Sequence, residues 1–155
     1  MQNFNINYDD GIRDFTINGD PNRILKININ DMGIIDRVQK ATEDIKKDLT
    51  LMKSSKIAIN SSGDSAEKKF EREAKVVREI NNKLRKRFDQ IFYKGASDIV
   101  FGTQNPLALN SSGATIYEAF LKAFVELMEP SFEEAAKASQ ERMGKYVEPG
   151  SMLSA

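Results

Sequence analysis

The sequence contains no cysteine and no histidine. Without cysteine the chain has no thiol nucleophile and forms no disulfide, which fits a cytosolic protein. Without histidine it lacks the commonest general base and a principal zinc ligand. Thiol catalysis, histidine-dependent catalysis and the common zinc sites are therefore excluded. An enzyme is the least favoured class, and we expect no catalytic residue, no metal ion, no cofactor and no small-molecule substrate.

The sequence also lacks a charge excess and a long apolar run. Its 23 Lys and Arg residues balance 23 Asp and Glu residues, so the formal net charge is zero. Proteins built mainly to grip nucleic acid usually carry a basic excess, whereas zero net charge removes one guard against self-association. No apolar run approaches the roughly 20 residues that span a bilayer, and the first ten residues are polar and acidic. We therefore expect neither a membrane partner nor a signal peptide.

What the sequence does contain is one long amphipathic stretch from Ser65 to Tyr93. Its apolar residues recur every three or four positions, which places them on one face of an α-helix about 40 Å long. A stripe of this length is not stable alone in water, so the rest of the chain, or another chain, must cover it. The stripe consists of Phe70, Ala74, Val77, Ile80, Leu84, Phe88 and Ile91, with Asn81 beside Ile80.

Two short runs near the start of the chain alternate between apolar and polar residues, as strands do. The first is Ile12–Asn18, and the second is Arg23–Ile29. The segment Asn18–Asn22 between them is rich in turn-forming residues, so we predict a β-hairpin. Because a lone hairpin is marginally stable in water, it should pack on a helix or join a sheet in another copy.

A first long helix is predicted from about Asp31 to Met52, where apolar residues again follow a helical spacing. The serine-rich segment Lys53–Gly63 is expected to be a polar hinge. Asp64 or Ser65 can then cap the second helix, and the short connection folds the two helices into an antiparallel pair.

The last third of the chain is predicted to hold shorter helices. Ser97 can cap a single helical turn that Gly102 ends. A helix follows over Thr115–Met128, and Pro130 should break or kink it before a further helix to about Tyr146. That last helix is weakly apolar, so it looks partly exposed or completed by a partner.

The fold class that these elements predict is mainly α: an N-terminal β-hairpin, a long antiparallel helix pair and one or two C-terminal helices. Residues 12–146 form one α-rich domain with the hairpin at 12–29. A flexible arm, 1–11, precedes it, and a tail, 147–155, follows it.

The most basic segment lies near the end of the second long helix and comprises Lys83, Arg85, Lys86 and Arg87. A patch for nucleic acid or another anionic partner is one interpretation. The other is a solvated helix end, because acidic residues lie upstream on the same helix, Asp89 follows directly, and basic residues suit the dipole near a helix C-terminus. The balance of charge favours the second.

Two segments resemble a known group of proteins. The first reads Phe15-Thr-Ile-Asn-Gly-Asp-Pro-Asn-Arg-Ile-Leu-Lys-Ile-Asn-Ile-Asn-Asp31, and the second reads Phe88-Asp-Gln-Ile-Phe-Tyr-Lys-Gly-Ala-Ser-Asp-Ile-Val-Phe-Gly102, followed by Asn105-Pro106-Leu107. They look like small proteins encoded among the tail genes of long-tailed phages and prophages of Gram-positive bacteria. Tyr93-Lys94 stands where an acidic residue or glycine is commoner in that group. The resemblance covers about residues 12–128.

The resemblance implies a non-enzymatic tail assembly chaperone, which holds the tape measure protein while tail tube subunits polymerise. It implies a location in the cytoplasm of the bacterial host or in the virion, and partners among the tail proteins or copies of the same chain. It brings no catalytic residues. Long amphipathic helices with exposed apolar stripes suit such a role.

Two alternatives stay open. One is a structural component of the assembled virion, in the tail, neck or baseplate, whose hairpin adds strands to a neighbour's sheet. The other is a nucleic-acid-binding regulator that uses the basic segment. For protein partners, the elements least able to satisfy themselves are the hairpin and the last helix, so the predicted contact residues are Phe15, Ile17, Leu25, Ile27, Phe132 and Met143.

Overall fold

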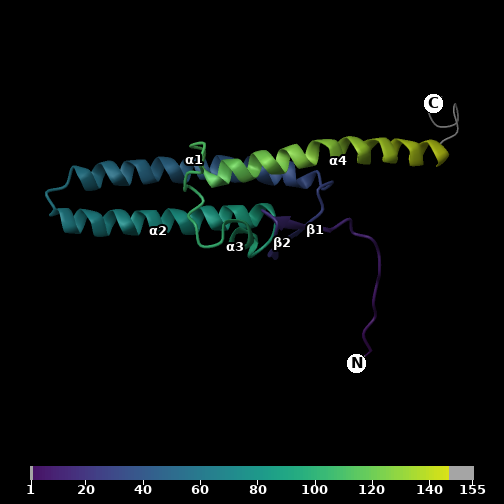
Figure 1. Cartoon of the computed structure of the whole chain (residues 1–155), viewed down its shortest axis with the longest axis horizontal. Helices are drawn as coiled ribbons and strands as arrows, with labels where there is room; N and C mark the ends of the chain where they lie inside the picture. Colours follow the sequence, from purple (N-terminus) through teal and green to yellow (C-terminus); the bar gives the residue numbers. More distant parts are fainter. Residues whose placement is uncertain (1, 147–155) are drawn as a thin grey trace.

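The computed structural model describes residues 2–146, and it confirms the predicted fold class (Figure 1). Within residues 131–146, several side chains (131, 132, 135, 136 and 142–146) are outside the description. The two long helices pack against each other along their length, and the C-terminal helix lies beside them. The elements are β1 (Arg13–Ile17), β2 (Asp20–Ile27), α1 (Gly33–Asn60), α2 (Ala66–Ile91), α3 (Ala96–Phe101) and α4 (Ile116–Tyr146).

The hairpin turns more tightly than the sequence suggested. β1 and β2 pair antiparallel, with Phe15 opposite Leu25. Asn18 and Gly19 both have positive φ, 51° and 74°, as the two central residues of a type I′ turn require. The predicted turn Asn18–Asn22 is therefore too long, because these two residues reverse the chain and β2 already begins at Asp20.

The predicted hinge at Lys53–Gly63 is wrong over most of its length, because α1 continues to Asn60. Serine lowers helix propensity only modestly, and Ile59 is buried, so packing favours two further helical turns. The connection is confined to residues 61–65. Ser65 caps α2 as predicted, since its side chain accepts a hydrogen bond from the Lys68 amide at 3.3 Å.

A carboxylate on α2 positions α3. Asp89 accepts hydrogen bonds from the backbone N–H groups of Ser97, at 2.7 Å, and Gly95, at 3.2 Å. Ser97 was predicted to cap this helix, but it lies buried inside the helix and the capping acceptor comes from Asp89. Gly102 ends α3 as predicted, with a φ of 59°. The Phe88–Gly102 motif therefore encodes a corner between two helices.

Three arginines bind backbone carbonyl groups where α2 and α3 end. Arg37 donates to the Ile91 carbonyl at 2.7 Å. Arg23 donates to the carbonyls of Ile99, at 2.8 Å, and Val100. Arg85 donates at 2.7 Å to each of two carbonyls in the loop after α3, those of Gly102 and Gln104. Helix C-termini leave such acceptors unpaired, so these side chains fix the corner to β2, α1 and α2.

An aromatic cluster forms the centre of the core. Phe88, which is fully buried, lies with its ring centroid 4.7 Å from that of Phe101 and 5.3 Å from that of Phe120. Phe92 and Tyr117 complete the contacts of this ring at 5.0 Å and 6.2 Å. The tilted and edge-on geometries are those that aromatic rings prefer. The cluster joins α2, α3 and α4, so it contributes to holding α4 on the rest of the fold.

Pro130 was predicted to break or kink this helix; a break is wrong, because α4 runs through this residue to Tyr146. Proline lacks the N–H that would bond to the Glu126 carbonyl four residues earlier. Glu126, Glu129 and Pro130 are all exposed, so water can reach that carbonyl. The surrounding Ala, Glu and Lys residues are strong helix formers, and they carry the helix past the proline.

Tyr117 should make folding sensitive to high pH. Its hydroxyl oxygen is buried and makes no hydrogen bond of good geometry, since the nearby Thr42 hydroxyl donates to the Val38 carbonyl. Burial raises the pKa of Tyr117 to about 12, and the proximity of Thr42 lowers it only in part. The folded state disfavours the phenolate, whose pKa in the unfolded chain is about 10. Ionisation of Tyr117 therefore leaves the free energy of unfolding unchanged below pH 10 and lowers it as the pH rises from 10 towards 12. Tyr117→Phe should gain about 1 kcal/mol at neutral pH, and its advantage should widen by about 1.4 kcal/mol at about pH 11.

Urea unfolding of both proteins across this range measures the effect. Lysines also titrate there, but they are common to both proteins and cancel in the comparison. A constant difference between the two proteins from pH 9 to pH 11 would contradict the expected role of the phenol.

Candidate partner-binding surfaces

The apolar stripe of α2 is covered at one end and bare at the other. Phe70, Val77, Leu84 and Ile91 recur every seven residues, so they lie on one side of the helix. Ile91 and Leu84 are 0% and 1% exposed, whereas Val77 is 39% exposed and Phe70 is 74% exposed. Exposure therefore rises steadily towards the N-terminus of α2. We call Phe70 and Val77 the distal stripe.

The position of α4 accounts for this gradient. α4 begins beside the middle of the helix pair, and α1 and α2 continue together past that point to the loop that joins them (Figure 1). α3 packs near the C-terminal end of α2. The distal half of the pair thus has no third layer within the described residues. Leu51 and Ile57 of α1 are exposed in the same half.

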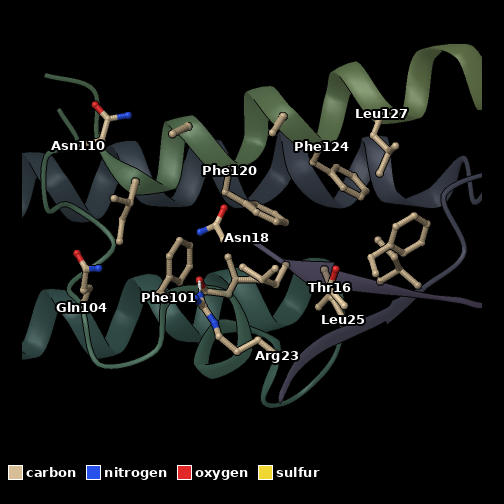
Figure 2. A pocket seen from close by; sticks show the side chains of 17 residues that line it. Thr16, Asn18, Arg23, Leu25, Phe101, Gln104, Asn110, Phe120, Phe124 and Leu127 are labelled. Carbon is tan, nitrogen blue, oxygen red and sulfur yellow. Dashed lines mark hydrogen bonds between the residues drawn. The ribbon is translucent and has the colours of Figure 1, made fainter. Parts of the chain in front are cut away.

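A second apolar surface lies between the hairpin and α4. It is a groove of about 510 Å³, with Phe120 and Phe124 of α4 on one side and Thr16 and Leu25 on the other (Figure 2). We call it the hairpin–α4 groove. The four contact residues predicted on the hairpin all line it, and they are Phe15, Ile17, Leu25 and Ile27. The two residues of β2 are buried, and the two residues of β1 are half-buried.

The other two predicted contact residues cannot be placed in the same way. Phe132 and Met143 belong to the C-terminal half of α4, and their side chains lie outside the described residues. Their predicted role stays a prediction.

The basic segment divides into two pairs. Arg85 binds Asp98, at 2.8 Å, as well as the loop carbonyls, and its side chain is only 15% exposed. Arg87 pairs with Asp48, at 3.3 Å, and with a second aspartate of α1. Lys83 and Lys86 are exposed. The two arginines thus serve contacts within the chain, and an anionic partner would meet mainly the two lysines.

The described residues show no group of three or more His, Cys, Asp or Glu side chains placed to hold a metal ion. Nor does any helix in the described part of the chain have the length and apolar character needed to cross a membrane. Ser97 lies in α3 and is buried, and its amide donates a hydrogen bond to Asp89.

One surface was missed by the sequence interpretation. Residues 1–11 were expected to be a flexible arm; of these, residues 2–10 are exposed and belong to no helix or strand, and Figure 1 shows them as an extended trace. Their apolar residues, Phe4, Ile6 and Tyr8, alternate with three asparagines. This period of two is a strand signal that could have been recognised from the sequence.

Comparison with protein families, curated proteins and solved structures finds no match for this chain.

Proposed function

We propose that this chain is a non-enzymatic assembly factor of the tail assembly chaperone kind, which binds an amphipathic helix of the tape measure protein. The partner helix lies along the distal stripe and takes the place that α3 and α4 occupy at the other end of α2. The resemblance of the hairpin and of the Phe88–Gly102 motif to phage tail-region proteins suggests the class of partner. The tail tube protein is the second candidate partner.

The observation that carries this proposal is the exposure gradient along α2. A stripe with one period continues from the fully buried Ile91 to the exposed Phe70, so the bare half has the same pattern that binds a helix elsewhere in the fold. Apolar residues at a seven-residue spacing suit a helix that packs at about 20° and inserts its side chains between them. Charged residues border the stripe on α2 and can pair with the polar flanks of a partner helix.

The double variant Phe70→Asp, Val77→Asp should lose this binding. Each carboxylate would be desolvated against an apolar partner, so the affinity for a tape measure segment should fall about 100-fold or more. Both side chains are exposed in the free chain, so its thermal unfolding should change little. Co-expression of the chain with helical segments of the tape measure protein, followed by co-purification and titration calorimetry, measures the loss.

Leu51→Asp is the matched control. Leu51 is an exposed apolar residue in the same half of the pair, but it lies about 120° around α1 from the buried Ile45. It should leave binding unchanged. Equal binding by the double variant and the wild type would refute the proposed site. Failure of the wild type to bind any tape measure segment, together with stoichiometric copies in purified particles, would favour a structural role in the virion.

A further inference from the structure

The N-terminal arm has the form of a strand without a sheet. Phe4, Ile6 and Tyr8 are 91%, 85% and 78% exposed. The Asn5 side chain donates a hydrogen bond to that of Asn7 at 3.1 Å, so these two asparagines lie on one side of the backbone. In a strand, the period of two would place the three apolar side chains on the opposite face. Among the residues that the structure describes, none hydrogen-bonds to the backbone of residues 2–8.

The start of the arm is fixed so that it leads away from its own domain. Gly11 has a φ of 75°, and a Cβ there would lie 2.6 Å from the Asn28 amide nitrogen. That nitrogen donates to the Asp10 carbonyl at 3.1 Å. The Asp9 and Asp10 carboxylates accept the next amides, those of Gly11 and Ile12. The arm therefore leaves the hairpin in a set direction, and Figure 1 shows it running away from the helices.

The β1 strand has a free edge beside the hairpin–α4 groove. The Lys26 amide of β2 donates to the Tyr93 hydroxyl at 3.1 Å, so it points away from β1. Asp14 is the register partner of Lys26, so the two form a non-hydrogen-bonded pair of the antiparallel ladder. In such a pair the backbone N–H and C=O groups of both residues point away from the partner strand. The backbone groups of Asp14 and, two residues on, of Thr16 therefore face outward. Thr16 also lines the groove.

We propose that the arm of one copy adds as a third strand to the β1 edge of a second copy. Phe4, Ile6 and Tyr8 then enter the hairpin–α4 groove, on the sheet face that carries Phe15 and Ile17. The three asparagines face outward. An unpaired edge is a template for strand addition, and a third strand stabilises a two-stranded sheet. This proposal is independent of the distal stripe and of the partner proposed for it.

The dimensions agree with this pairing. Residues 3–8 span about 20 Å as a strand, close to the length of β1. Three side chains of this size bury about 500 Å² of the arm's own surface, and the groove loses a smaller area. If each of two copies inserts its arm into the other, the buried area exceeds about 1,000 Å², the lower limit expected of a specific interface.

The first test is the mass of the full chain in solution, by light scattering over a concentration series. We expect the wild type to be an oligomer. The triple variant Phe4→Asn, Ile6→Asn, Tyr8→Asn should be a single chain at the same concentrations, with the thermal unfolding of its helices unchanged. A wild type that is a single chain at every concentration would overturn the proposal, and so would a triple variant that keeps the wild-type mass.

The second test identifies the surface that the arm binds. Thr16→Pro removes an outward-facing N–H of β1, and proline is tolerated at the free edge of a sheet, so the hairpin keeps its own pairing. This variant should also be a single chain. Mixed with the triple variant, which keeps its edge but lacks its anchors, it should form a heterodimer with one inserted arm. No heterodimer in the mixture would count against pairing between the arm and the edge.

A disulfide distinguishes a second copy from the arm's own chain. The chain has no native cysteine, so a disulfide reports only on introduced residues. Ile6→Cys in one copy and Ala123→Cys, which lines the groove, in another should become linked on mild oxidation. If the mixture gives no cross-linked pair, and one chain that carries both changes closes on itself, then the arm folds back and the proposal is wrong.

Discussion

Replacing Phe88 by Ala should lower the free energy of unfolding by about 4 kcal/mol. Phe88 is fully buried, and its ring lies against rings from α3, from α4 and from Phe92, the residue that follows α2. Removing it takes away the transfer free energy of a phenyl group and leaves a cavity that four large neighbours cannot fill by moving together. Since the same ring joins α4 to the core, α4 should also become more accessible. Urea unfolding measures the first effect, and limited proteolysis within α4 measures the second.

Phe88→Leu is the matched control, because it keeps an apolar side chain and most of the volume. It should cost about 1.5 kcal/mol and leave α4 protected. If the Ala variant lost no more stability than the Leu variant, the ring would not be the centre of the core.

Replacing Arg87 by Met should cost about 3 kcal/mol. Arg87 on α2 lies 3.3 Å from an oxygen of Asp48 and 3.7 Å from an oxygen of Asp44, both on α1. The Asp48 side chain is only 6% exposed, so removing the arginine leaves a buried carboxylate without a cation. Equilibrium unfolding in urea at neutral pH measures the loss.

The second change Asp48→Leu should restore most of what Arg87→Met removes, because it withdraws the unpaired charge as well. Lys26→Met gives the contrasting case. Lys26 pairs with Asp14 at 3.9 Å where both side chains are exposed, and removing such a pair should have no measurable effect. Equal losses of unfolding free energy for Arg87→Met and Lys26→Met would show that the buried pair stabilises the fold no more than the exposed pair does.

The fold followed from local patterns where those patterns were long. The helical spacing from Phe70 to Ile91 and the alternation around Phe15 and Leu25 were sufficient to predict the helix pair and the hairpin. The predictions were wrong at Ser54-Ser55 and at Pro130, which are weak or strong helix breakers in isolation. In the structure, burial of Ile59 favours a longer α1. Water can reach the Glu126 carbonyl, whose helical hydrogen bond Pro130 removes, so the helix can continue through the proline. Tertiary packing and access to water decide such cases, and neither is visible in a short window.

The candidate surfaces were predicted only in part. The hairpin residues that line the groove were recognised because a lone hairpin cannot bury its own face. The bare half of the α2 stripe could not be recognised, because Phe70 and Leu84 look alike in the sequence. What distinguishes them is where α4 begins, and this depends on the loop that returns the chain from α3.

The three arginine side chains that end on backbone carbonyls also set how the molecule opens. Arg23, Arg37 and Arg85 come from β2, α1 and α2, and all of them hold the stretch between Ile91 and Gln104. Hairpin, corner and the adjoining halves of the long helices must therefore separate together or not at all. At the far end of the helix pair, Lys69 donates to the Asn60 carbonyl at 3.3 Å and Arg72 pairs with Asp64 at 2.8 Å. Both contacts stay within the turn and the helix ends beside it, so this end can open separately and exchange its amides with solvent in smaller openings. A partner could therefore change the conformation of the far end of the helix pair while the hairpin and the corner stay folded.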